Sequence, residues 1–162
     1  MIRQLRLDER LIHGQVAAAW SKFLDIDTIV VASDVASKDD SVKKILLMGA
    51  PVGKKVAIRS IDDTIRLLSD QRANKMKVLI ISDNPKDSIK LVVSLNITEV
   101  NVANYKAKKA DNKIKILASK IEATKEDFDD FVELSKLVDN IYSQALPTSI
   151  PISFKTLLKN AK

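Results

Sequence analysis

Short apolar runs rich in β-branched residues alternate along this chain with segments in which apolar residues recur every three or four positions. The first pattern is typical of buried strands and the second of amphipathic helices. We predict strands over residues 2–7, 28–32, 55–59, 78–81, 99–103 and 139–146. We predict helices over residues 14–24, 41–48, 61–68, 85–95, 124–137 and 153–158, whereas residues 113–117 remain ambiguous.

Several side chains are expected to build the core. In the helix over residues 41–48, we expect Val42, Ile45 and Leu46 to face inward, because they fall on one side of a helix. The aromatic side chains predicted to be buried are Trp20, Phe128 and Phe131, and Tyr105 and Tyr142 are left open.

The alternation of strands and helices predicts an α/β fold with a mainly parallel sheet covered by helices on both faces. No repeat, low-complexity segment or linker interrupts it, so we predict a single domain over residues 1–162. Sheets of this kind bind ligands outside the carboxyl ends of their strands. We therefore expect residues 8–13, 33–34, 82–84 and 103–104, which all follow strands, to gather along one edge.

Composition narrows the chemistry that is available. The chain has 162 residues, enough for one domain with a sizeable core, and no apolar run approaches the ~20 residues that span a bilayer. The absence of cysteine excludes disulfides, thiolate zinc sites and cysteine nucleophiles. With only one histidine, a metal site would be mostly carboxylate, which disfavours zinc and leaves only Mg²⁺-like ions. We predict no metal site and no cofactor.

The net charge of +6 raises the alternative of a nucleic-acid-binding module. However, the lysines are spread along the whole chain. The densest run is Lys106, Lys108, Lys109, Lys113 and Lys115. It lacks the interleaved aromatic residues that single-strand binders use as stacking platforms. We interpret it as a solvated face or a docking surface for an acidic partner, and we predict no nucleic-acid partner.

The one histidine, His13, lies in the most unusual local setting of the chain. Arg6, Asp8 and Arg10 precede it, Gly14 follows it, and a predicted helix begins there. An imidazole nitrogen can accept a phosphoryl group and release it later. Asp8 could orient the ring, and Arg10 and Arg6 could supply donors for the phosphoryl oxygens. The free N–H groups of the helix start would add to that anion site.

Each of these features also has a simpler structural explanation. A histidine before a helix is often a capping or surface residue, and Asp8 with Arg10 could be an ordinary surface ion pair. The polar residues at positions 33–34 and 82–84 could be ordinary turn residues. The local pattern alone leaves these alternatives open.

The segment over residues 6–16 resembles a family signature, Arg-x-Asp-(Asp/Glu)-Arg-Leu-Ile-His-Gly-Gln-Val, with every fixed position present. It is the signature of the IIB components of the mannose/fructose/sorbose-type sugar phosphotransferase system. The similarity continues over residues 30–36, 46–51, 83–87 and 100–102, and it covers essentially the whole chain.

This resemblance implies an open, doubly wound α/β fold and a phosphohistidine carrier. Such a carrier accepts a phosphoryl group from the IIA component, holds it on the histidine that matches His13, and passes it to a sugar imported by the membrane subunits IIC and IID. The activity class would be protein-Nπ-phosphohistidine–sugar phosphotransferase, with no cofactor beyond the covalent phosphohistidine. The protein would be cytoplasmic and attached to the membrane through its partners, and a homodimer is left open.

The resemblance also implies roles for individual residues. Arg10 matches the arginine that stabilises the phosphoryl group, and Asp8 matches its neighbouring carboxylate, so both are expected to be catalytic with His13. We further predict phosphate contacts from Arg6, Gly14, Gln15, Asp34, Ser82 and Asn84. One departure is that many relatives carry two glycines where this chain has Ala103 and Asn104, which puts the shape of that loop in question.

Two other classes of function compete with the carrier. A regulatory domain of receiver type shares the fold class and would use a carboxylate at a strand end, such as Asp34. It normally has an adjacent acidic pair after the first strand, whereas here Asp8 and Glu9 are followed by Arg10. A nucleic-acid-binding module would show steeply salt-dependent binding, and failure to bind at low salt would exclude it.

Overall fold

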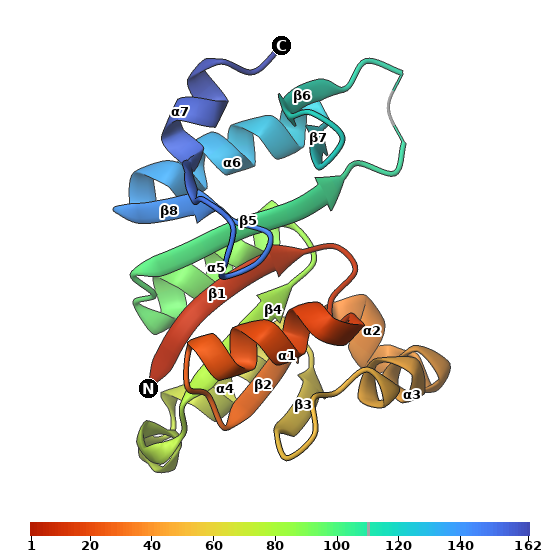
Figure 1. Cartoon of the computed structure of the whole chain (residues 1–162), viewed down its shortest axis with the longest axis vertical. Coiled ribbons are helices and arrows are strands. Elements are labelled where there is room, and N and C mark those ends of the chain that lie inside the picture. Colours follow the sequence, from red (N-terminus) through yellow and green to blue (C-terminus); the bar gives the residue numbers. More distant parts are fainter. Residues whose placement is uncertain (110) are drawn as a thin grey trace.

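The computed structural model of the protein describes residues 1–109 and 111–162 (Figure 1). Its strands are β1 (Ile2–Asp8), β2 (Thr28–Ala32), β3 (Lys55–Arg59), β4 (Val78–Ser82), β5 (Glu99–Lys106), β6 (Ile114–Leu117), β7 (Ile121–Ala123), β8 (Asn140–Ser143) and β9 (Ile152–Ser153). Its helices are α1 (Gly14–Phe23), α2 (Asp34–Lys38), α3 (Asp40–Met48), α4 (Ile61–Ser69), α5 (Pro85–Leu95), α6 (Lys125–Leu137) and α7 (Phe154–Lys159), with a 3₁₀ turn η1 (Gln71–Lys75).

The strands form one sheet in the order β3-β2-β4-β1-β5-β7-β6, and β8 pairs with the first half of β5. Neighbouring strands from β3 to β5 are all parallel. Within the described residues only the β6–β7 and β8–β9 pairs are antiparallel. The prediction of a mainly parallel sheet is therefore confirmed, and β1 lies at its centre.

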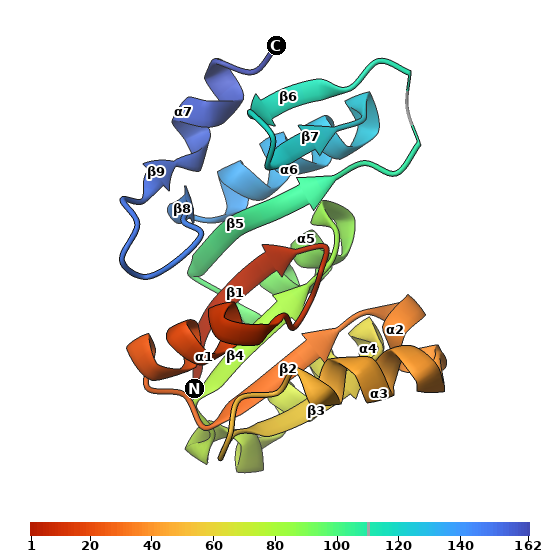
Figure 2. The same ribbon diagram turned by 45° about the vertical axis from the view of Figure 1, so that its right-hand side comes forward.

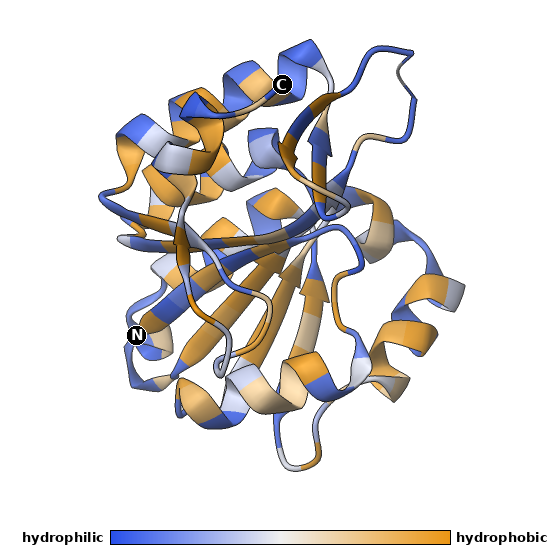
Figure 3. Ribbon diagram, turned by 45° about the horizontal axis from the view of Figure 1, so that its top comes forward, coloured by the Kyte–Doolittle hydropathy of each residue, from blue (hydrophilic) through white to orange (hydrophobic). Residues whose placement is uncertain are grey.

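Helices cover both faces of this sheet, as the doubly wound fold requires. Helices α1, α2 and α3 pack on one face, and α4, α5 and α6 pack on the other, with α7 beside α6 (Figures 1 and 2). Every residue of β2 and β4 is buried, as expected for apolar strands between two helical layers. The hydropathy colouring shows these central strands as apolar ribbons between more polar helices (Figure 3).

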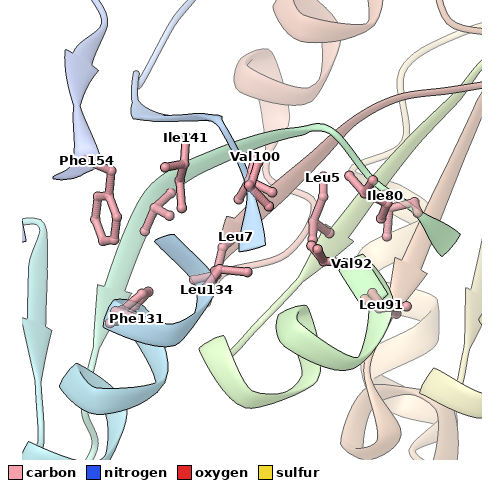
Figure 4. Packing of buried hydrophobic residues seen from close by; sticks show 14 of the residues in the cluster. Leu5, Leu7, Ile80, Leu91, Val92, Val100, Phe131, Leu134, Ile141 and Phe154 are labelled. Carbon is pink, nitrogen blue, oxygen red and sulfur yellow. The ribbon is translucent and has the colours of Figure 1, made fainter. Parts of the chain in front are cut away.

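Alternation along β1 sends its side chains to two different environments. Leu5 and Leu7 point into the larger core, where they lie among Leu91 of α5 and Leu134 of α6 (Figure 4). The predicted burial of Trp20 and Phe131 is confirmed, since both are fully buried. Phe128 is only partly buried against the same core.

Local sequence signals explain where the helices of the second layer begin. The Asn84 side chain accepts a hydrogen bond from the Asp87 amide, and Pro85 occupies the first turn of α5. Thr124 and Asp127 form a reciprocal capping box at the start of α6. Such caps satisfy backbone donors that have no partner within the helix.

The structure departs from the predicted elements at several short segments. Helix α2, the turn η1 and the strands β7 and β9 were not predicted, because two to five residues are too few to show a period. The ambiguous residues 113–117 contain β6, and β8 is shorter than the predicted strand. The inward orientation predicted for Ile45 is wrong: its side chain is 68% exposed, because α3 packs through Val42 and Leu46.

Candidate functional site

The site begins with a row of buried polar side chains on β1. Gln4, Arg6 and Asp8 alternate with Leu5 and Leu7, so they lie on the opposite face of the strand. All three are buried, with exposed fractions of 0%, 3% and 0%. Since β1 is the central strand, its last residue, Asp8, lies at the middle of the carboxyl edge of the sheet.

The loop after β1 wraps around the Asp8 carboxylate. The Arg10 amide donates to Asp8 Oδ1 at 3.1 Å, and the Leu11 amide donates to the Asp8 carbonyl at 2.9 Å. Leu11 has a φ of 59°, a left-handed conformation that costs a non-glycine residue on the order of 1 kcal/mol. Gly14 has a φ of 44°, which glycine adopts without that penalty. This turn places His13 immediately before the first turn of α1.

His13 and Asp8 form the central pair of the site. Nε2 of His13 lies 2.8 Å from Oδ2 of Asp8, and the histidine side chain is 25% exposed. An ionised carboxylate only accepts hydrogen bonds, so Nε2 carries the ring proton and donates it. No described residue forms a hydrogen bond with Nδ1, and the side chain does not cap α1. The lone pair of Nδ1 is therefore available for attack on an electrophile.

Asp8 is kept ionised by its neighbours despite its burial. Burial by itself would raise the pKa of this carboxyl group. The hydrogen bond with His13, the charge of Arg6 and the hydrogen bond from Arg10 together outweigh burial, and the pKa of Asp8 lies below its ordinary value. Arg6 Nη2 lies 3.2 Å from Oδ2, and Arg10 Nε lies 3.2 Å from Oδ1.

Arg10 is bound through one part of its guanidinium, while the rest of the group is exposed. Its Nε atom is bound to Asp8, yet its side chain is 55% exposed. Within the described residues its two Nη groups form no hydrogen bond, so they can donate to an anion beside His13. Gly14 and Gln15 are exposed in the first turn of α1, where backbone N–H groups lack partners within the helix. The structure thus brings together five of the predicted residues: Asp8, Arg10, His13, Gly14 and Gln15.

Arg6 has a different place from the one predicted. Its guanidinium is buried behind Asp8 and donates to the carbonyl oxygens of Gln144 and Ala145 at 3.3 and 3.4 Å. It also lies 5.5 Å from the centre of the Trp20 ring. A group whose donors are buried in this way does not reach a phosphoryl group on the exposed side of His13. We therefore no longer expect Arg6 to contact the phosphoryl group directly.

Ser82 and Asp34 also hold structural hydrogen bonds. Ser82 is fully buried, and its hydroxyl lies 2.6 Å from that of Ser88. Asp34 Oδ1 accepts a hydrogen bond from the Ile61 amide at 2.9 Å, at the start of α4. We therefore no longer expect either side chain to hold phosphate.

The strand ends do gather along one edge, as expected, and enclose a hollow of about 320 Å³. It is lined by Glu9, Ser33, Asp34, Val35, Asp83, Asn84, Asp87, Tyr105 and Lys108. Asn84 donates to Asp83 and Asp87 there and caps α5. The four carboxylates of this lining repel a phosphate dianion, so we no longer expect Asn84 to hold phosphate either. A larger hollow of about 690 Å³ beside α4 includes none of the predicted site residues.

Ala103 and Asn104, where this chain differs from the pattern that it resembles, lie in a regular strand. Both residues continue strand β5, and the register with β1 shifts between Leu7 and Asp8. The backbone amide of Glu9 donates to the backbone carbonyl of Asn104 at 3.0 Å, and the side-chain Nδ2 of Asn104 donates to the Glu9 carboxylate at 3.2 Å. Asn104 therefore fixes the start of the His13 loop through one backbone and one side-chain hydrogen bond to Glu9.

Sequence reasoning missed the contribution of residues 144–149. Their backbone carbonyls receive hydrogen bonds from Arg6, Trp20 and Asn101, and a backbone acceptor leaves no mark in a sequence. The sequence did contain a sign of these contacts in one of the residues that donate the hydrogen bonds. Asn101 is a polar residue inside an apolar strand, and it lies directly opposite Arg6.

Neither a metal-binding cluster nor a membrane-spanning helix is found in the described part of the chain. Over residues 1–109 and 111–162, no three side chains of His, Asp or Glu converge closely enough to hold a metal ion. None of the helices in these residues has the length and apolar character needed to cross a membrane.

Comparison with known proteins identifies the family. The family model "PTS system sorbose subfamily IIB component" matches residues 2–162. A probable phosphotransferase enzyme IIB component of Streptococcus pyogenes is 34% identical over 168 residues, covering 98% of this chain and 99% of the relative. The IIBSor domain of the sorbose permease from Klebsiella pneumoniae has the same fold, with a TM-score of 0.89 and 23% identity over 99% of this chain and 97% of that one.

A longer relative shares the same region. The mannose-specific EIIAB component of Escherichia coli is 36% identical over 98 residues, which represent 60% of this chain and 30% of that protein. IIB components of this system are phosphotransferases of sugar transport. With the family match over nearly its whole length and a site built around His13, the chain belongs to the sorbose subfamily of IIB components of the sugar phosphotransferase system.

Proposed function

We propose that His13 accepts a phosphoryl group on Nδ1 and passes it to a sugar during import. The observation that carries this proposal is the 2.8 Å pair between His13 Nε2 and Asp8 Oδ2, which leaves Nδ1 as the nucleophile. The Nη groups of Arg10 and the first-turn amides of α1, which begins next to His13, would donate to the phosphoryl oxygens. Phosphoryl transfer requires mainly positioning and charge stabilisation, and these groups supply both.

The proposed transfer has two balanced steps. In the first, the Nδ1 lone pair attacks the phosphorus of a donor phosphohistidine, and the donor P–N bond breaks, so that its electron pair returns to the donor ring. His13 keeps its Nε2 proton and becomes a phospho-imidazolium that faces the Asp8 carboxylate. In the second, a sugar hydroxyl attacks the phosphorus, the P–Nδ1 bond breaks, and the hydroxyl proton is released.

We further propose that the donor is a IIA component and that the acceptor sugar is held by membrane subunits IIC and IID. The E. coli relative with joined A and B parts supports the pairing of IIA with IIB. In this arrangement the protein works in the cytoplasm and meets the membrane through its partners. The phosphohistidine is the only group it carries, without a metal or other cofactor.

The deciding experiment is the intact mass of the protein after incubation with the phosphorylated general carrier proteins and a cognate IIA. We expect a single gain of ~80 Da in the wild type that is lost in mild acid, stable in base and absent from His13→Ala. No gain in the wild type, with a IIA shown to be phosphorylated, would contradict the proposal. A base-labile gain that persists in His13→Ala and disappears in Asp34→Asn would favour the receiver-type alternative.

A further inference from the structure

A segment far along the chain crosses back over the polar face of β1. We call residues 144–149, which follow β8, the strap. Asn101 of β5 holds its first residue on both sides: the Gln144 amide donates to Asn101 Oδ1 at 3.0 Å, and Asn101 Nδ2 donates to the Gln144 carbonyl at 2.9 Å. The Gln144 side chain closes the strap on itself by donating to the carbonyls of Pro147 and Ser149. The strap is thus a folded element fixed to β5.

The strap supplies the acceptors for two buried donors. The Ala145 carbonyl receives the Trp20 indole N–H at 3.0 Å and one Arg6 N–H at 3.4 Å. The Gln144 carbonyl receives another Arg6 N–H at 3.3 Å. A buried guanidinium is costly unless its donors are paired, so the strap makes the buried position of Arg6 tolerable.

Arg6 connects the strap to the reacting ring. Its Nη2 atom lies 3.2 Å from Asp8 Oδ2, the same oxygen that binds His13 Nε2 at 2.8 Å. Arg10, in contrast, contacts the other oxygen, Oδ1. Arg6 therefore restrains the rotation of the carboxylate at the oxygen that orients the histidine. A continuous line of contacts runs from the strap through Arg6 and Asp8 to His13.

We propose that the strap and Arg6 are positioning elements that fix the protonated nitrogen and the orientation of the His13 ring. Neither touches the phosphoryl group: they act through Asp8. The kinetic part of this inference rests on the proposed carrier function, whereas the effect on the ring is a property of the unphosphorylated protein. An experiment can therefore refute the carrier function without refuting the effect on the ring, and the reverse.

The test uses the fact that His13 is the only histidine, so its ring nitrogens are the only imidazole signals in a ¹⁵N spectrum. Two variants act on the strap without touching Asp8 or His13. Asn101→Ala removes the clamp on Gln144, and Trp20→Phe removes the N–H that binds Ala145. In both, we expect the Nδ1 and Nε2 shifts to move toward each other as the second tautomer becomes populated. Ser82→Ala removes another buried hydrogen bond and is the matched control, with unchanged ring shifts.

Variants of Arg6 test the link between the strap and Asp8. Arg6→Gln removes the charge and most donors, whereas Arg6→Lys keeps a cation beside Asp8. We expect the ring shifts to change more in Arg6→Gln than in Arg6→Lys. We also expect phosphoryl acceptance to slow by about 10-fold to 100-fold in Arg6→Gln, the size of effect that a small misplacement of a reacting group produces.

The inference is overturned if the ring shifts of folded Asn101→Ala and Trp20→Phe match those of the wild type. Should Asn101→Ala fail to fold, Trp20→Phe and the Arg6 pair decide the question alone. If the ring shifts of Ser82→Ala change as much as those of Asn101→Ala and Trp20→Phe, the changes reflect a general loss of stability. That result would also overturn the inference. A wild type that accepts no phosphate would refute the carrier function, while the ring comparison would still test the strap.

Discussion

The imidazole of His13 faces the buried carboxylate of Asp8 through Nε2, at 2.8 Å, and turns Nδ1 away from it. This orientation predicts which nitrogen becomes phosphorylated. In the phosphorylated protein, we expect ³¹P–¹⁵N coupling at Nδ1 and a retained proton on Nε2. Coupling at Nε2 would require the ring to leave Asp8 and would contradict the geometry of the site.

Arg10 should contribute to transfer through its free Nη groups. We expect Arg10→Ala to slow phosphoryl acceptance by about 100-fold or more, the typical effect of removing one donor aimed at developing charge. Single-turnover transfer from phosphorylated IIA measures this rate. The chain offers a matched control: Arg72 donates its amide and Nε to Asp70, two residues earlier, as Arg10 does to Asp8. Arg72→Ala should transfer like the wild type, and a similar rate in Arg10→Ala would remove Arg10 from the mechanism.

The lowered pKa of Asp8 predicts a pH-dependent contribution to stability. A carboxyl group whose pKa is lower in the folded protein stabilises it above the ordinary pKa, 3.8 here, and loses that contribution as the pH falls through the folded value. The difference in free energy of unfolding between wild type and Asp8→Asn should thus be largest near neutral pH and shrink in acid. Urea unfolding at a series of pH values measures it. A difference that stays constant down to acid pH would contradict the buried ionised carboxylate.

Ser82 should matter for stability and not for transfer. Its hydroxyl is buried against Ser88, so Ser82→Ala is expected to cost about 1 kcal/mol, the usual net value of a hydrogen bond. Phosphoryl acceptance should remain at the wild-type rate. If transfer falls by an order of magnitude while the fold is intact, the phosphate contact originally predicted for Ser82 would be reinstated.

Phe131 is expected to be a major contributor to the core. It is fully buried and packs edge-to-face against Tyr105 and Phe154, with ring centres 5.5 and 5.3 Å away. We expect Phe131→Ala to lower the free energy of unfolding by about 3–5 kcal/mol. Phe23→Ala is the comparison, because that side chain is 63% exposed and its loss should cost far less. Equal costs in denaturant unfolding would contradict this assignment of the core.

The sequence predicted the fold well because its signals are local. Fully apolar strands such as β2 and β4 and capped helices such as α5 are recognisable within a few residues. The pair of His13 and Asp8 was predictable for the same reason, since both belong to one continuous signature. The contacts of Arg6 were not predictable, because they depend on the segment that covers its face of β1, and that segment begins at residue 144.

The same limit applies to the other strand ends. Asp34 was expected at the phosphate, yet its partner is an amide 27 residues later in the chain. Its position on the correct edge was predictable from the alternation of elements. The hydrogen bond that engages it was not, because it depends on where α4 begins in space.

Strand β5 pairs with β8 through residues 99–101 and with β7 through residues 105–106. The strand pairing of the last third of the chain with the central sheet therefore runs through this one strand, while α6 and the strap add side-chain contacts to α5, β1 and α1. Such a region can open as a cooperative unit while the central strands stay folded. The strap belongs to that unit, so each opening also releases Arg6 from its acceptors. If the strap positions His13 as proposed, the fraction of molecules whose His13 is ready to react depends on the local stability of a region that contains none of the reacting atoms.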